Sequence, residues 1–338
     1  MRLGDISVAF VELMARAVSE QGHNPKPILL QYQLDEVRIS SPQARISIPR
    51  FMHLGHAFIH EFNLPQLGLL MGQLSGGSTS GLAGMLAQCA PNLGQACKDL
   101  TEFELLTSFN ARGRSIFRME QGRGVLEFYS ISPYNSYNLF VVDSVLGGWA
   151  QFLAGLAPKH RLIERIEFEF EAPNYKDQYE RHLPAPAHFG CERNALVFYP
   201  DALKTPVHTR NASTWALLRG YAENELAKVK HGLSFKEQTE RAIGSLLNGS
   251  TPSLDDVAKR LNSTPWVIRR RLQSEGYSFQ QLLNDTRKDL AIAYVTRTSL
   301  TLGEIAYLLG FGSPVAFQRA FKRWTGIAPG QYRQSVTP

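Results

Sequence analysis

Hydrophobic and polar positions follow two different periods along this chain. In residues 165–170, Ile166, Phe168 and Phe170 alternate with acidic side chains, which is the period-two pattern of a strand with one buried face. Further strands are predicted at residues 115–119, 125–131 and 195–199. Helices are predicted at residues 28–39, 50–62 and 137–156. Because strands and helices are mixed, residues 1–230 are expected to form an α+β regulatory domain.

In the last third of the chain only the helical period persists, and one pattern occurs twice. Residues 253–276 and 301–326 align at an offset of 48 positions, with one additional residue in the second copy. The aligned pairs include Leu254 with Leu302, Ala258 with Ala306, Pro265 with Pro314, Ile268 with Phe317, and Leu272 with Phe321. Helices are also predicted before the first copy, at residues 235–247, and between the copies, at 279–296. Residues 231–338 are therefore expected to form an all-α domain of two related units joined by a long helix.

Each unit carries start and stop signals for two short helices. A hydroxyl caps the first helix and an acid follows three positions later, which is the spacing of a capping box, although an aspartate is the weaker partner. After about nine residues comes a residue type that tolerates left-handed backbone, and then a hydroxyl followed by proline opens the second helix. In the first unit these signals are Ser253, Asp256, Asn262 and Thr264-Pro265. In the second unit they are Thr301, Glu304, Gly310 and Ser313-Pro314. The order predicts two helix-turn-helix units.

The second helix of each unit is expected to read DNA. Its apolar side chains at i and i+4 face inward, so the basic and amide side chains between them point outward. Arg and Gln on an exposed helix can reach base edges in the major groove, and Lys and Arg on its flank can reach phosphates. The predicted DNA-binding residues are Trp266, Arg269, Arg270, Gln273, Val315, Gln318, Arg319, Lys322 and Arg323. A solvated amphipathic helix would explain either helix alone, but the duplication favours DNA recognition.

Helix length and charge agree with this hypothesis. The connecting helix at 279–296 has eighteen residues, or about 27 Å at ~1.5 Å per residue, close to the ~34 Å between successive major grooves. We expect both reading helices on one side of the duplex, with DNA bending where the two spacings differ. Residues 1–230 hold 22 Lys+Arg and 22 Asp+Glu, whereas residues 231–338 hold 14 and 8. The net charge of +6 therefore lies in the last third, as expected of a nucleic-acid-binding module on a neutral domain.

The motifs also resemble a known family. Residues 253–333, with AFQRAFKRWTG at 316–326 and PGQYR at 329–333, are similar to the DNA-binding domain of AraC/XylS transcriptional regulators. That resemblance implies base contacts from Trp266, Arg269 and Arg270 and from Val315, Gln318 and Arg319. Family members often carry a polar residue where Pro314 and Val315 stand, so direct reading by the second helix is expected to be narrower here.

The preceding region resembles the arabinose-binding-type N-terminal domain of the branch that includes regulators of ornithine utilisation. The similar segments are LPQLGLLMG at 64–72, GLAGMLAQCAPNLGQACKDL at 81–100, and residues 173–207. The resemblance implies effector sensing or dimerisation, although nothing in these residues selects a sugar. It also implies activation through contact with RNA polymerase.

The chain is therefore interpreted as a sequence-specific regulator that binds double-stranded DNA, with a regulatory domain at 1–230 and a double helix-turn-helix domain at 231–338. We expect a cytoplasmic homodimer that acts as an activator; the sequence leaves open whether a small-molecule effector exists and which one it is. Alternatives are a repressor, an architectural protein that bends DNA with weak sequence preference, and an enzyme addressed to DNA. A stripe within residues 212–229, formed by Trp215, Leu218, Ala222, Leu226 and Val229, could serve the dimer or pack on its own domain.

Other candidate chemistry is weaker. His53, His56 and His60 share one helix face, but a lone helix gives poorly angled ligands, and we expect no metal site. Cys89, Cys97 and Cys191 lack metal spacing and are expected to be reduced and packed. No catalytic or nucleotide-binding motif occurs, so neither enzymatic activity nor a cofactor is expected. The apolar segment 139–157 is interrupted by Asp143 and two glycines, and the N-terminus lacks a signal-peptide pattern, so no membrane span is expected.

Overall fold

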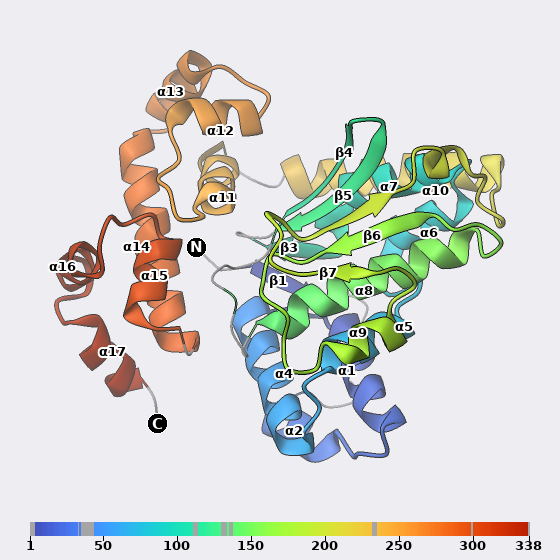
Figure 1. The fold of residues 1–338 in the computed structure, drawn as a ribbon. Helices are drawn as coiled ribbons and strands as arrows, with labels where there is room; N and C mark the ends of the chain where they lie inside the picture. The colour runs from blue at the N-terminus through green and yellow to red at the C-terminus, as the bar shows by residue number, and fades with distance from the viewer. Residues whose placement is uncertain are drawn as a thin grey trace.

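The computed structural model describes residues 4–32, 34, 44–110, 114–129, 134, 138–231, 235–298 and 300–336. It contains a mixed N-terminal domain with two sheets and a C-terminal helical region (Figure 1). The fold class predicted from the sequence is confirmed.

The N-terminal domain has one small and one larger sheet. In the small sheet β1 (Gly4–Ser7) lies between β2 (Arg45–Ser47) and β3 (Ser108–Asn110), antiparallel to both. The larger sheet has the order β4-β5-β8-β6-β7, and its neighbours are antiparallel except for the parallel pair β6 and β7. Its strands are β4 (Arg114–Glu120), β5 (Arg123–Tyr129), β6 (Ile163–Glu167), β7 (Ala187–His188) and β8 (Ala195–Phe198).

Helices pack against the two sheets, and in Figure 1 α6, α8 and α10 lie behind the strands of the larger sheet. They are α1 (Ala9–Glu20), α2 (Lys26–Gln31), α4 (Ile48–Phe62), α5 (Leu67–Leu74), α6 (Gly81–Cys89), α7 (Leu93–Glu102), α8 (Leu139–Leu156), α9 (Asp177–His182) and α10 (Ala212–His231), with 3-10 turns η1 (Glu104–Leu106) and η2 (Ala202–Lys204). Helix α8 contacts α5 and strands β5, β6 and β8. A Cβ on Gly72 of α5 would lie 2.9 Å from the backbone of Gly147 in α8. Glycine at 72 therefore allows the two helices to touch.

Helix α8 is the core helix of this domain. Among the described residues it is the one helix that would pass for a membrane span by length and composition. Most of it is buried, however, and Asp143 in its middle accepts hydrogen bonds from the hydroxyls of Tyr175 (2.9 Å) and Tyr179 (2.7 Å). Burial raises the pKa of Asp143 to about 7, although the two hydroxyls favour the ionised form. The helix thus packs inside the protein, as its sequence predicts.

The C-terminal region is entirely helical. Its elements are α11 (Phe235–Leu246), α12 (Leu254–Arg260), α13 (Pro265–Ser274), α14 (Phe279–Arg297), α15 (Leu302–Leu308), α16 (Pro314–Thr325) and α17 (Pro329–Val336). Helix α11 packs against α12, α13 and α14. Helices α15, α16 and α17, which follow α14 in the sequence, also pack against α14. Helix α14 therefore joins a first unit, α11 to α13, to a second unit, α15 to α17, and the two units lie at different places along it (Figure 1).

Several predicted boundaries need correction. The helix predicted at 28–39 is α2, which ends at Gln31; residues 35–39 lie outside the described residues. The strand predicted at 165–170 ends at Glu167, because the backbone of Phe168 bonds to His188 and Cys191 instead of continuing the pairing with β8. The predicted strand at 125–131 and the predicted helix at 137–156 include residues 130–131 and 137, which also lie outside the described part. So do residues 232–234, at the boundary of the two predicted domains. The first helix of each unit has 7 residues and not about nine.

The apolar stripe of α10 packs on its own domain. Ala222 and Leu226 are buried in a cluster with Ala83, Leu86 and Phe103. Trp215 donates its indole N–H to the buried carboxylate of Asp99 (2.8 Å), which also pairs with Arg219 (2.9 Å). Val229, at the end of the stripe, is 39% exposed. Of the two roles left open for this stripe, the structure therefore supports packing on its own domain, because its central side chains already have partners.

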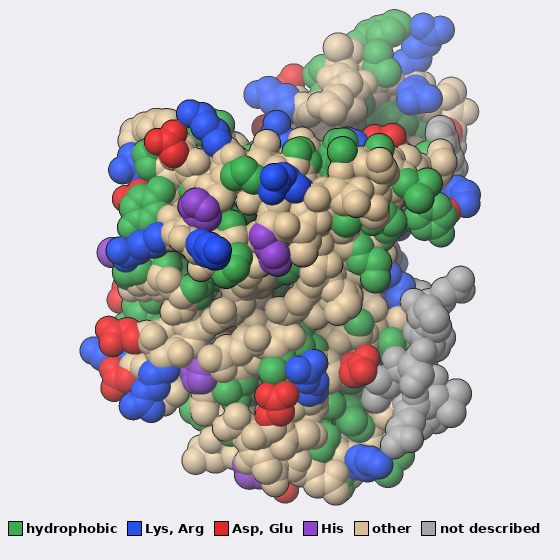
Figure 2. Space-filling model, turned by 90° about the vertical axis from the view of Figure 1, so that its right-hand side faces the viewer, with side chains coloured by type: hydrophobic (Ala, Val, Ile, Leu, Met, Phe, Trp, Pro, Cys, Tyr) green, Lys and Arg blue, Asp and Glu red, His purple; other side chains and the backbone are tan. Residues whose placement is uncertain are grey.

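One face of the N-terminal domain carries side chains of both charges. Figure 2 shows the face that lies to the right in Figure 1, where acidic and basic side chains are interspersed. This agrees with the even balance of charges before residue 231. The surface gives no sign of a basic stripe on that face.

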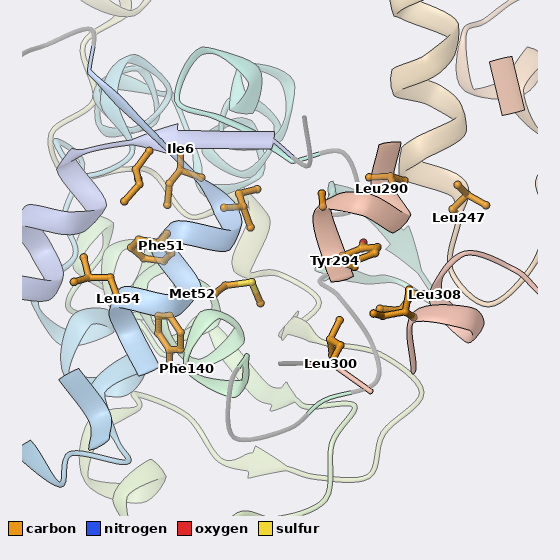
Figure 3. Close-up of a cluster of buried hydrophobic side chains, with 14 of the residues drawn as sticks. Ile6, Phe51, Met52, Leu54, Phe140, Leu247, Leu290, Tyr294, Leu300 and Leu308 are labelled. Atoms are coloured by element: carbon orange, nitrogen blue, oxygen red, sulfur yellow. The ribbon is translucent and has the colours of Figure 1, made fainter. Parts of the chain in front are cut away.

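The two regions meet through a shared hydrophobic cluster. Helix α4 contacts α14, and Met52 of α4 extends toward the side chains around Tyr294 and Leu300 (Figure 3). Ile6, Phe51, Leu54 and Phe140 lie on the side of Met52 that is away from Tyr294 (Figure 3). The cores of the two regions are thus continuous at this point.

Candidate nucleic-acid interface

The second helix of each unit is held by a small apolar core. In α16, Phe317 and Phe321 are fully buried, and their rings lie 5.7 Å apart. Phe311 in the preceding turn lies 5.7 Å from Phe317 and 6.0 Å from Trp324. Tyr332 of α17 packs edge-on against Phe321 at 5.4 Å. These rings fix which side of α16 faces inward.

The first unit uses aliphatic side chains in the same places. Ile268 and Leu272 of α13 are fully buried. Arg271 is also exposed, but its guanidinium lies 4.7 Å above the ring of Phe235, on the side of α13 that faces α11. The alignment of Ile268 with Phe317 and Leu272 with Phe321 is thus confirmed as an equivalence of core positions.

All four helix starts are capped as predicted. Ser253 and Asp256 form a complete capping box, and so do Thr301 and Glu304. The aspartate therefore serves as well as the glutamate in closing the box. Thr264 and Ser313 accept the backbone N–H groups three positions on, at 3.4 Å and 3.2 Å. The turns pass through left-handed backbone at the two predicted stops, Asn262 (φ 48°) and Gly310 (φ 67°).

The nine predicted DNA-binding side chains all lie at exposed positions of α13 and α16. They are Trp266, Arg269, Arg270, Gln273, Val315, Gln318, Arg319, Lys322 and Arg323. Trp266 is 62% and Val315 56% exposed, which is unusual for large apolar side chains. Neither helix has an acidic residue in its first turn. Each helix therefore presents a face with cations, an amide and one uncovered apolar group.

Trp266 and Arg270 form a pair on the exposed face of α13. The guanidinium carbon of Arg270 lies 5.2 Å from the centre of the indole ring. Such stacking is worth about 0.5–1 kcal/mol at an exposed site. It limits the conformations of Arg270 before any contact with DNA.

Two arginines that hold the second unit in place were not identified by the sequence analysis. Arg287 of α14 donates to the carbonyls of Leu309 (2.9 Å) and Gly310 (3.0 Å), and it lies 5.0 Å above the ring of Phe311. Arg333 of α17 donates to the carbonyls of Val295 (3.0 Å) and Leu300 (2.7 Å). Burial lowers the pKa of both guanidinium groups. The PGQYR segment contains Arg333, but its sequence does not indicate which carbonyls it binds.

The other candidate residues do not assemble into a site. No group of three or more His, Cys, Asp or Glu able to hold a metal occurs among the residues that the structure describes. His56 and His60 lie with ring centres 6.4 Å apart on α4. Cys97 is buried, and Cys89 and Cys191 are half-buried; all three are free thiols. Burial raises the pKa of Cys97 far above its ordinary value, so it stays a thiol.

Comparisons with known proteins agree with both regions. The family described as the arabinose-binding domain of AraC transcription regulators, N-terminal part, matches residues 22–207, and a helix-turn-helix domain family matches residues 257–335. The ornithine utilization regulator of Pseudomonas aeruginosa is 27% identical over 98% of this chain and 96% of its own length. The urease operon transcriptional activator of Escherichia coli is 45% identical over 30% of this chain and 35% of its own length.

Among solved structures, the transcriptional regulator CdpR from Pseudomonas aeruginosa is similar to this chain. The alignment covers 92% of this chain and 96% of CdpR, with 20% sequence identity and a TM-score of 0.43. The first family match alone covers more than half of the chain. The chain belongs to the AraC family of transcription regulators.

Proposed function

We propose that this regulator reads DNA with α13 and α16, placed in two adjacent major grooves. The observation that supports the proposal is the pair of capped second helices, each of which buries an i, i+4 apolar pair and leaves its cationic face uncovered. Arg269, Arg270 and Arg319 contact base edges, together with Trp266, Val315 and Gln318. Lys322, Arg323 and Gln273 complete the contact at the flanks.

Helix α14 sets the distance between the two reading helices. Its 19 residues span about 28 Å at ~1.5 Å per residue. The spacing of successive major grooves is about 34 Å, so the DNA bends toward the protein where the two lengths differ. Arg287 and Arg333 keep the second unit fixed on α14, which makes the connection rigid.

We further propose the organisation and the action of the whole chain. Residues 1–230 sense a small molecule and residues 231–338 bind DNA, with the boundary between α10 and α11. The chain acts in the cytoplasm as a homodimer and activates transcription through RNA polymerase, as the names of activator relatives suggest. It has no catalytic role of its own. The face of α10 opposite its buried stripe exposes Leu217 (74%) and Tyr221 (57%), which supports a contact between copies there.

Selection of binding sites from a random duplex library with the full chain tests this proposal. We expect enriched sites that contain two conserved blocks about one helical turn apart. Enrichment without any shared sequence would instead identify an architectural DNA-bending protein. Reporter transcription from a promoter that carries the selected site then separates activation from repression.

A further inference from the structure

A cavity lies in the N-terminal domain, away from the reading helices. Its volume is about 130 Å³, and it is partly open to solvent. It is lined by the small sheet, strands β4 and β5, helices α1, α4, α6, α7 and α8, and the segment 75–80 between α5 and α6. An apolar cavity of about 150 Å³ holds one benzene molecule. This cavity is slightly smaller and open on one side, so it has room for about one six-membered ring, and a short substituent would lie toward the opening.

Aromatic rings form much of its wall. They belong to Phe10, Phe51, Phe128, Trp149 and Phe152. Trp149 meets Phe128 edge-to-face at 5.9 Å, so its position is fixed. Faces of aromatic rings attract cations as well as apolar groups.

Glu104 of η1 is the one ionisable side chain among the described residues that line the cavity. Its two carboxylate oxygens accept hydrogen bonds from the hydroxyl (2.7 Å) and the backbone N–H (3.2 Å) of Ser115. A carboxylate has about four acceptor positions, so roughly two remain for a ligand. Burial raises the pKa of Glu104, whereas the bonds from Ser115 and the charge of Arg260 lower it.

The hydroxyls of the lining offer acceptors more than donors. Ser75, Thr107 and Ser144 donate their protons to the carbonyls of Met71, Ser80 and Val141, at 3.0, 3.0 and 2.9 Å. Ser115 donates to Glu104. Thr79 also accepts a hydrogen bond, from the backbone N–H of Gly76 (3.2 Å). A ligand that brings donors therefore finds several acceptors in this wall. An anionic ligand would find a carboxylate and no described Lys, Arg or His in the lining.

We infer that this cavity binds a small amine: a protonated nitrogen at Glu104, on an apolar body about the size of one aromatic ring. The inference rests on the proposed function, because it names the chemical class of the effector. Fatty acids and amino acids fit less well, since each brings a carboxylate into a lining that has Glu104 and no described Lys, Arg or His. Sugars fit less well because most of the wall is apolar and aromatic.

The cavity is linked to the DNA-binding region at two points. Arg260, which influences Glu104, belongs to α12 of the first unit. Phe51 lines the cavity, and its neighbour Met52 on α4 extends toward Tyr294 of α14 (Figure 3).

Binding of matched probes to the full chain tests the inference. Calorimetry and thermal unfolding would compare 2-phenylethylamine with 2-phenylethanol, phenylacetate and L-arabinose at millimolar concentration. We expect the amine to bind best, the alcohol more weakly, and the anion and the sugar not at all. Equal or tighter binding of phenylacetate or arabinose, or no binding of the amine, would overturn the inference.

Two variants locate the amine. Glu104→Gln keeps the shape and should weaken amine binding about tenfold, as loss of a charged hydrogen bond predicts. Glu102→Gln removes an equal charge from the nearby surface, where Glu102 pairs with Arg219, and should leave amine binding unchanged. Equal amine affinity in the wild type and in Glu104→Gln would contradict the assignment.

Sequence-selective DNA binding is measured on the same preparations without any probe. Its loss would count against the proposed function. Failure of the amine to bind while DNA binding is intact would overturn the cavity inference alone.

Discussion

Three consecutive arginines in α13 provide a sharp test of the interface. Arg269 is exposed, and the structure gives it no partner among the described residues, so Arg269→Ala should leave folding stability within about 0.5 kcal/mol of the wild type. If Arg269 contacts a base, the same change should cost about 1–3 kcal/mol of binding, which is roughly 5- to 150-fold in Kd. The effect should be confined to DNA that carries the selected site.

Arg271→Ala is the matched control, because it removes the same charge from the same helix. Arg271 stacks on Phe235, so its loss should lower the free energy of unfolding by about 0.5–1 kcal/mol. Its effect on DNA should be small and equal for all sequences, as expected of a general loss of charge.

Fluorescence anisotropy on the selected and scrambled duplexes at fixed salt, together with thermal unfolding, measures both quantities. Equal weakening by Arg269→Ala on both duplexes would make Arg269 a phosphate contact. If Arg271→Ala lost specificity and Arg269→Ala lost stability, the assigned orientation of α13 would be refuted.

Other perturbations probe the supports of the interface and the domain behind it. Arg287→Met should destabilise the second unit by about 1.5–3 kcal/mol, because the carbonyls of Leu309 and Gly310 lose a charged donor; urea unfolding checks this. Asp143 has a raised pKa in the folded state, so its stabilising effect is complete below about pH 4 and is lost as the pH rises through about 7, a change of up to about 4 kcal/mol. Unfolding measured from pH 4 to 8 should therefore show falling stability in the wild type and a smaller fall in Asp143→Asn; the same fall in both would exclude Asp143 as the cause. Leu226→Ala should cost about 2–4 kcal/mol of stability in chemical denaturation, whereas an effect on sedimentation alone would restore the dimer interpretation of the α10 stripe.

The helix-turn-helix units could be predicted from the sequence because their signals are local. A cap, a left-handed stop and a proline at the first helical position lie within a few residues of the helix they define. Such signals placed Ser313 and Gly310 correctly, and the i, i+4 spacing identified Phe317 and Phe321 as core.

What could not be predicted depends on partners that are distant in the sequence. The strands of the small sheet have only 3 or 4 residues each and pair across about forty to a hundred positions, so no period reveals them. Arg287 has the sequence environment of a solvated helix face and becomes a brace only when α15 packs beside it. The stripe of α10 indicated a buried face but not the surface that covers it. Nothing in the sequence around Glu104 indicates that its side chain lines a cavity.

The hydrophobic cluster shared by α4 and α14 has a consequence for truncated forms of the protein. A fragment that begins after α10 would lack Met52 and its neighbours and would expose apolar side chains near Tyr294 and Leu300 to water. We expect such a fragment to self-associate, and the intact chain to melt in one cooperative step, because neither half keeps its full core when the other is removed.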